Sequence, residues 1–125
     1  MHIVQVAQHA DDLDRAAAFY TQLLGEEPAA RFRSPDLLFF NLGTTRLLLQ
    51  PDAPSTVVYL LVDDVAHAVA AARDRGVEIV DDPHVIYTHV DDSLGPVDTD
   101  EWQAFIRDSE GNTVGLVSHE PRHDP

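Results

Sequence analysis

Three histidines, His9, His84 and His89, are the candidates for catalysis, because an imidazole can act as a general base or bind a metal ion near neutral pH. His84 and His89 stand close to Asp81 and Asp82, and these four residues could hold a metal ion. Residues an odd number of positions apart point to opposite faces of a strand, so such a site requires a loop. Otherwise both histidines are exposed to solvent and have no such role.

His9 belongs to a predicted strand. Residues 3–10 alternate loosely between apolar and polar types and include β-branched residues, which places Gln5 and His9 on the same face. On that face His9 could act as a general base or form a hydrogen bond with a ligand. No nucleophile or orienting carboxylate stands at a fixed spacing from it, so polar packing at the end of the strand is the competing interpretation.

A capped helix follows this strand, and a second version of it appears later in the chain. In each version an acidic residue caps an Ala-rich helix with an apolar stripe, and a glycine follows the last turn in the left-handed conformation. In the first version Asp11 or Asp12 is the cap, the helix is 13–24 and the glycine is Gly25. In the second version Asp63 or Asp64 is the cap, the helix is 65–75 and the glycine is Gly76. The sequence therefore indicates one unit used twice.

Short strands complete each copy of the unit. The expected strands are 3–10, 26–34, 37–42 and 45–50 in the first copy, and 56–62, 77–80, 101–107 and 113–118 in the second. Gly43 suits the tight turn of a hairpin, in which Phe39 opposes Leu48 and Leu37 opposes Gln50. Each copy is then βαβββ, which predicts an α+β fold.

The chain is long enough for one domain with its own core. We expect a first module over about 1–52, a Pro-rich joint, a second module over about 56–118 and a polar tail at 119–125. A long loop is expected at 81–100, with an acidic stretch at 91–101. Loops of that length in compact domains are usually functional or mobile.

Composition limits the partners. The formal net charge is −14, with 22 acidic residues, eight arginines and no lysine. Such a field disfavours nucleic acids and membrane surfaces and attracts cationic ligands, although general solubility explains it equally well. There is no cysteine, no signal-peptide pattern and no apolar run long enough to span a bilayer, so we expect a cytoplasmic protein.

Three motifs in this order resemble the vicinal oxygen chelate superfamily, which includes glyoxalase I, bleomycin resistance proteins and extradiol dioxygenases. They are Asp12-Leu13 with Phe19-Tyr20 and Leu24-Gly25, then Val62-Asp63-Asp64-Val65, then Asp108-Ser109-Glu110-Gly111-Asn112. The resemblance covers nearly the whole chain. It implies two βαβββ modules that form a curved mixed sheet around a cavity, commonly completed by a homodimer.

The resemblance also implies where metal ligands would stand. The ligand of the first strand falls on Gln5, which can serve. The His of the second module falls on Val57, the Glu near the last turn falls on Gly115, and the carboxylate of the first module falls near Leu48 or Gln50. A catalytic metal normally needs three protein ligands, and Val57 and Gly115 offer none. We therefore expect no metal and no cofactor at the family's site.

A cavity lined by aromatic rings and a few amides suits a flat or amphipathic organic ligand. Trp102 and Phe105 lie on opposite faces of their strand, and a bulge would decide which one points inward. Core packing explains Phe39 equally well. The expected ligand-binding residues are Gln5, His9, Phe39, Leu48, Gln50, Val57, Tyr59, Tyr87, Trp102 and Phe105.

The leading hypothesis is a metal-free protein that binds and sequesters a cationic or aromatic small molecule, in the manner of bleomycin resistance proteins that confer antibiotic resistance. The alternative is a lyase or isomerase of the glyoxalase type with a divergent site around His9, Gln5 and the loop that carries His84 and His89. A third hypothesis is a non-catalytic regulatory module. The leading hypothesis makes the protein a binder rather than an enzyme.

Overall fold

The protein is represented by a computed structural model, which describes residues 1–123. The chain divides into two compact units, described here one at a time. The first holds Met1–Thr56 and the turn Asp108–Asn112, and the second holds Val57–Arg107 and the residues from Thr113 onward. No helix in the described part of the chain is long and apolar enough to cross a membrane.

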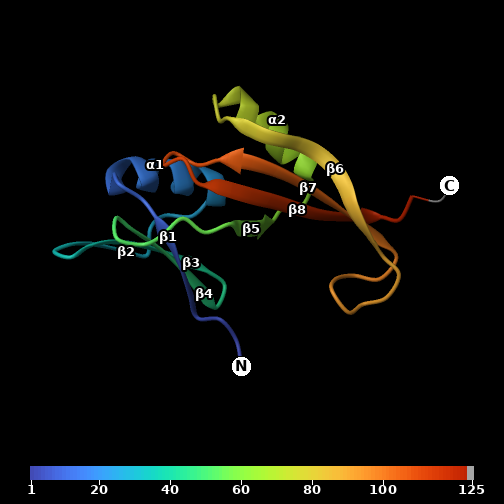
Figure 1. The fold of residues 1–125 in the computed structure, drawn as a ribbon, viewed down its shortest axis with the longest axis horizontal. Helices are drawn as coiled ribbons and strands as arrows, with labels where there is room; N and C mark the ends of the chain where they lie inside the picture. Colours follow the sequence, from blue (N-terminus) through green and yellow to red (C-terminus); the bar gives the residue numbers. More distant parts are fainter. Residues whose placement is uncertain (124–125) are drawn as a thin grey trace. The chain divides into compact units, whose positions relative to one another are not determined.

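Each unit contains one helix and one four-stranded sheet (Figure 1). The elements are β1 (Gln5–His9), α1 (Leu13–Leu24), β2 (Ala30–Arg33), β3 (Asp36–Leu42), β4 (Thr45–Gln50), β5 (Val58–Leu61), α2 (Val65–Asp74), β6 (Ile79–His89), β7 (Thr99–Arg107) and β8 (Thr113–Pro121). The order is β1-β4-β3-β2 in the first sheet and β5-β8-β7-β6 in the second. The first strand of each sheet is parallel to its neighbour, and the other pairs are antiparallel. The predicted α+β fold of two βαβββ modules is confirmed, whereas a cavity shared by the two sheets stays a prediction.

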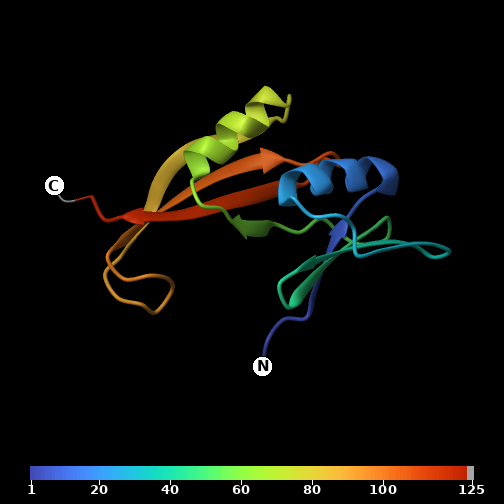
Figure 2. The ribbon, with the colours of Figure 1, turned by 180° about the vertical axis from the view of Figure 1, so that it is seen from behind.

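Both predicted helices are confirmed, with their caps. The Asp12 carboxylate accepts a hydrogen bond of 3.0 Å from the backbone N–H of Arg15, and Gly25 ends α1 with a φ of 67°. In α2, Asp64 accepts one of 3.1 Å from the N–H of His67. These caps satisfy backbone donors that the first turn of a helix leaves free. α2 lies along one face of the second sheet (Figure 2).

The hairpin of the first module has the predicted register, because Phe39 pairs with Leu48. The neighbouring residues of β3 point to the other face, where Phe40 packs against Tyr20 of α1 with ring centroids 6.1 Å apart. Tyr20 and Phe40 are almost completely buried. Alternation along β3 therefore separates a core face, covered by α1, from the face that carries Phe39.

The prediction of a loop over 81–100 is wrong for most of these residues, because they belong to strands. β6 runs through it to His89, and only residues 90–98 form a loop. β6 is the edge strand of its sheet, and its pairing with β7 is interrupted by register shifts. Edge strands tolerate a proline such as Pro83 and exposed charges, which disguise the strand in the sequence.

The last strand is also longer than predicted. The sequence predicts that it ends at Ser118 and that a polar tail follows, but β8 continues to Pro121, which pairs with Thr99 at the start of β7. His119 therefore lies inside a strand and has a fixed direction. Residues 124–125 of the expected tail lie outside the described part of the chain.

The turn Asp108–Asn112 is held by a buried carboxylate. Asp108 accepts hydrogen bonds of 2.6 Å from the Tyr20 hydroxyl and 2.7 Å from the Asn112 side chain, and its other oxygen accepts from the backbone N–H groups of Glu110 and Asn112. The Asn112 amide also donates to the carbonyl of His9 at 2.7 Å. A buried charge is stable only with such partners.

We predict that Tyr20→Phe lowers the free energy of unfolding by about 1–3 kcal/mol, because it removes one donor from a buried carboxylate. Urea denaturation measures the change. Tyr59→Phe is the matched control, since Tyr59 is 54% exposed; it should change stability by less than about 0.5 kcal/mol. Equal effects at the two positions would contradict the importance of the Tyr20 hydroxyl.

Glu110 in the same turn makes stability depend on pH. Burial acts to raise its pKa, but hydrogen bonds from Arg15, the backbone of Asp12 and Ser109 outweigh burial and lower the pKa from 4.5 to about 2. A lowered pKa means that the stabilisation is complete above the unfolded value and is lost as the pH falls from about 4.5 towards about 2. The side chain of Glu110 is 1% exposed, so solvent screens these bonds little.

We therefore predict that Glu110→Gln costs about 2 kcal/mol near neutral pH and much less near pH 2. Urea denaturation across this range measures both values. The control is Glu27→Gln at an exposed position, which should leave the pH dependence of the protein unchanged. The hypothesis fails when the two variants lose the same stability at every pH.

Candidate functional site

The second sheet has one face covered by α2 and one face turned away from it. The backbone N–H of Val65, at the start of α2, donates to the Ser118 hydroxyl at 3.1 Å, which places Ser118 on the helix side. Because side chains alternate along β8, Gly115 and His119 lie on the opposite side. Gly115 pairs with Tyr59 of β5 and with Phe105 of β7, so these residues share that side.

Two aromatic rings meet over Gly115. The centroids of Tyr59 and Phe105 are 5.7 Å apart with an interplanar angle of 77°, an edge-to-face arrangement. A Cβ atom on residue 115 would lie 2.6 Å from Tyr59 Cδ2 and 3.2 Å from Phe105 Cε1. Only glycine permits this approach of the ring to the backbone.

This packing is incompatible with the glutamate that the resemblance implies at residue 115. A glutamate there could not coexist with the observed position of the Tyr59 ring, since even its Cβ would overlap the ring. Val57, at the other ligand position that the resemblance implies, is 49% exposed and offers no donor atom. Aromatic and aliphatic surface therefore stands in the second module where metal ligands were expected.

We call Val57, Tyr59, Tyr87 and Phe105 the aromatic face of the second module. All four are predicted ligand-binding residues. Tyr87 pairs with Glu101, which alternation along β7 places on the same side as Phe105. Val57, Tyr59 and Tyr87 are between 44% and 54% exposed, so an apolar surface is open to a ligand.

Trp102, also a predicted ligand-binding residue, lies on the other side of β7. It lines a pocket of about 650 Å³ beside the beginning of α2. The lining residues are Asp64, Val65, Ala66, Val85, Asp100, Trp102, Ser118, Glu120, Pro121 and His123. Three carboxylates around one indole suit a cation with an apolar body. The structure thus separates Trp102 from Phe105, as the sequence predicts.

The remaining predicted ligand-binding residues lie on one face of the first sheet. Cross-strand pairs join Gln5 to Arg46, Ala7 to Leu48 and His9 to Gln50, and Leu48 pairs in turn with Phe39. Alternation places Gln5, His9, Phe39, Leu48 and Gln50 on the side opposite α1. The prediction that they bind a ligand is not tested by this arrangement.

Gln5 and His9 already have hydrogen-bond partners. Gln5 Oε1 accepts from Arg46 Nε at 3.0 Å. His9 Nδ1 lies 3.1 Å from the Ala53 carbonyl, and its Nε2 lies 3.2 Å from the Asp11 carboxylate. Burial lowers the pKa of His9, but the hydrogen bond and charge of Asp11 outweigh it, and the pKa is raised. A larger fraction of this imidazole is therefore protonated at neutral pH.

The structure separates the histidines of the proposed His84–His89 metal site. His84 is exposed, with Nδ1 2.9 Å from the Asp82 carbonyl and 3.7 Å from the Asp81 carboxylate. The His89 side chain is 1% exposed. The two do not form a common site, because they stand opposite Gln103 and Thr99, four residues apart along β7.

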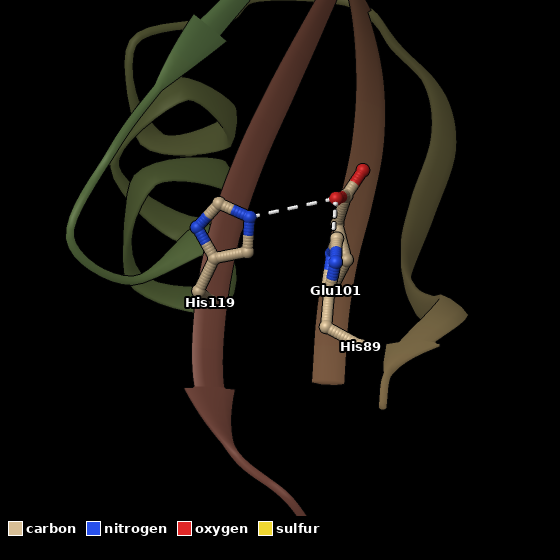
Figure 3. A group of neighbouring side chains, drawn as sticks. All are labelled: His89, Glu101 and His119. Carbon is tan, nitrogen blue, oxygen red and sulfur yellow. Dashed lines mark hydrogen bonds and ion pairs between the residues drawn. The ribbon is translucent and has the colours of Figure 1, made fainter. Parts of the chain in front are cut away.

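His89 instead meets Glu101 of β7 and His119 of β8 (Figure 3). His89 Nε2 lies 2.9 Å from Glu101 Oε1, and His119 Nε2 lies 3.4 Å from the same oxygen. Burial acts to raise the pKa of Glu101, but hydrogen bonds from His89, Gln103 and His119 outweigh it and lower the pKa. Glu101 is therefore an anion at neutral pH.

Sequence reasoning missed Glu101 and His119 as functional residues. The three members of the cluster come from three strands, so no spacing in the sequence connects them. His119 was also assigned to a tail, although its pairing with Glu101 gives it a fixed place. Residues 118–121 are Ser, His, Glu and Pro and show no apolar–polar alternation, so the sequence offers no signal for the longer strand.

Comparison with known proteins agrees with this fold. The family model of the Glyoxalase/Bleomycin resistance protein/Dioxygenase superfamily matches residues 2–116. No curated protein sequence matches the chain. Many solved structures do match it, with low sequence identity.

Three of these structures illustrate the range. TnmS3, an antibiotic binding protein from Streptomyces sp. CB03234, has a TM-score of 0.75 and 23% identity, over 96% of this chain and 97% of that chain. Lactoylglutathione lyase from Agrobacterium tumefaciens has a TM-score of 0.71 and 23% identity, over 94% and 92%. A superfamily member from Sphaerobacter thermophilus has a TM-score of 0.73 and 17% identity, over 94% of this chain and 97% of that chain.

Proposed function

The chain belongs to the glyoxalase/bleomycin resistance protein/dioxygenase superfamily, and we propose that it binds a small organic molecule without a metal at the family's ligand positions. The observation that carries the proposal is the Tyr59 ring over Gly115. The resemblance implies a carboxylate at this position in relatives that use a metal. In this chain the same position carries an aromatic surface, on which the apolar part of a ligand can pack without a metal.

The aromatic face supports a ligand with a flat apolar part. Tyr59 and Phe105 are already in edge-to-face contact, so little side-chain freedom is lost when a third ring packs on them. The exposed Val57 extends the apolar area beside them. Burying such a surface under a ligand is favourable by about 25 cal/mol per Å².

Charge supports a cationic ligand. The net charge of −14 attracts cations to the whole molecule. The carboxylates of Asp64, Asp100 and Glu120 beside Trp102 line a pocket on the other side of β7, so they add to this overall charge and not to the aromatic face itself. An aromatic or amphipathic cation, such as a glycopeptide or a planar aromatic antibiotic, combines both features. The fold shared with the antibiotic binding protein TnmS3 is consistent with this class.

The proposal includes sequestration by a homodimer in the cytoplasm, which would contribute to antibiotic resistance. Members of this fold family commonly complete their cavity by pairing two chains, and each of the two open sheets has edge strands that can pair with another chain. The absence of cysteine fits a reducing compartment.

The alternative function, a lyase or isomerase with a divergent site, has less support. It depends on Gln5, His9 and the segment that carries His84 and His89. Gln5 and His9 are engaged by Arg46, Ala53 and Asp11, and Gly115 supplies no carboxylate to move a proton. These contacts favour binding over catalysis.

We predict that at least one cationic glycopeptide or planar aromatic antibiotic raises the melting temperature in a thermal-shift panel. A ligand at 100 times its Kd adds about 2.7 kcal/mol, which is a shift of about 10 °C for a domain of this size. A panel without any shift contradicts the proposal.

Variants then locate the ligand. Tyr59→Ala and Phe105→Ala should weaken binding at least about 10-fold by calorimetry, because each removes a large contact surface. Trp102→Phe on the other side of β7 should leave the affinity within about 2-fold. The reverse pattern would move the ligand to the Trp102 pocket and reject the aromatic face as its site.

We predict a dimeric mass by light scattering at micromolar concentration. The edge strands of the two open sheets and the fold family support this expectation. Dilution should shift the mass towards that of one 13.8 kDa chain only well below this concentration. A mass of one chain throughout would reject the homodimer and leave ligand binding to a single chain.

A further inference from the structure

Three side chains with metal-binding atoms converge on one point of the second module. His89 comes from the end of β6, Glu101 from the beginning of β7 and His119 from the later part of β8 (Figure 3). Their nearest nitrogen and oxygen atoms all lie within 4.8 Å of one another. We infer that His89, Glu101 and His119 form a binding site for a divalent transition-metal ion, with Zn²⁺ as the best fit.

The donor atoms match zinc chemistry. Two imidazole nitrogens and one carboxylate oxygen form a common ligand set of zinc sites that keep a fourth position for water or a ligand. Bonds of about 2.0–2.1 Å in a tetrahedral site place ligand atoms about 3.3 Å apart. The distances from Glu101 Oε1 to the two Nε2 atoms are 2.9 Å and 3.4 Å, close to this spacing. The ligand atoms of all three residues lie within 4.8 Å of one another, so no pair has to close by more than about 1.5 Å to admit an ion.

The surroundings fix two of the ligands in advance. The His89 side chain is 1% exposed and packs edge-to-face on Tyr87, with ring centroids 4.8 Å apart. Gln103 Nε2 donates to Glu101 Oε2 at 2.6 Å, which leaves Oε1 turned to the histidines. Such outer hydrogen bonds orient ligating carboxylates and typically change metal affinity 10- to 100-fold.

Gly95 in the loop of residues 90–98 closes the site. A Cβ atom on this residue would lie 2.9 Å from His89 Cε1 and 3.2 Å from His119 Nε2. The loop backbone therefore approaches both imidazoles as closely as a glycine allows. This approach shields the cluster from water on one side, and it leaves no room for a larger residue.

The proposed site differs from the family's ligand positions. It lies further along β8 than Gly115, and Glu101 and His119 form a cross-strand pair on the same side as the aromatic face. The inference does not depend on the proposed antibiotic binding, since no ligand-binding variant above changes a member of the cluster. Zinc titration and antibiotic titration of the same protein can fail separately.

The test is calorimetric titration of tag-free protein with Zn²⁺, together with elemental analysis after dialysis. We expect about one equivalent of bound zinc. Glu101→Gln keeps the shape but removes the negative charge, and it should weaken binding at least about 10-fold, as should His119→Ala. His84→Ala is the matched control on β6, and it should bind zinc as the unsubstituted protein does.

Replacement of zinc by Co²⁺ gives a readout that needs no variant. A tetrahedral cobalt site with two imidazoles and a carboxylate absorbs visible light strongly, whereas hydrated cobalt absorbs weakly. Gly95→Ala should weaken or shift this spectrum, although it removes no donor atom.

Two results would overturn the inference. One is less than about a tenth of an equivalent of zinc, with no change in the cobalt spectrum. The other is zinc binding that Glu101→Gln and His119→Ala leave unchanged, which would place the ion on the surface carboxylates. In either case the three residues would form only a hydrogen-bonded cluster.

Discussion

The carboxylate of Asp108 is the constraint on which the second sheet depends. It is 6% exposed and accepts hydrogen bonds from Tyr20, from the side chain of Asn112 and from two backbone N–H groups of its own turn. Because these bonds define the turn, they also define where β8 begins opposite β7. Every pair from Arg107–Thr113 to Thr99–Pro121 follows from that starting point.

Register matters here because a shift of one residue moves every side chain of a strand to the other face. In the observed register Phe105 stands opposite Gly115, and Glu101 stands opposite His119. A slip would bring Trp102 to the aromatic face and remove His119 from Glu101. One buried turn thus determines both the apolar and the polar end of the same sheet face.

The sequence predicts the parts of the fold that depend on neighbouring residues. The capped helices and the register of Phe39 and Leu48 follow from local spacing and are confirmed. That residue 115 is a glycine, at a place where the resemblance implies a glutamate, can also be read from the sequence.

β6 and the cluster of His89, Glu101 and His119 could not be predicted in the same way. β6 is an edge strand whose composition is not typical of a strand, and it forms because β7 provides its hydrogen-bond partners. The cluster needs the exact end of β6 and the continuation of β8 past Ser118, and both are set by pairing with β7. Residues joined only by such pairing have no common pattern in the chain.

The position of the Tyr59 ring depends on glycine at residue 115. The absence of a side chain at residue 115 leaves space beside the backbone, and the Tyr59 ring fills that space and packs on Phe105. A glutamate at residue 115 would therefore require the Tyr59 ring to move, because its Cβ atom would overlap the ring. Gly95 has a similar role at the other end of the face, where the absence of a side chain lets the loop approach the imidazoles of His89 and His119. At both glycines the missing side chain permits a close contact. At Gly115 the contact produces an aromatic surface, and at Gly95 it brings the loop against two imidazoles.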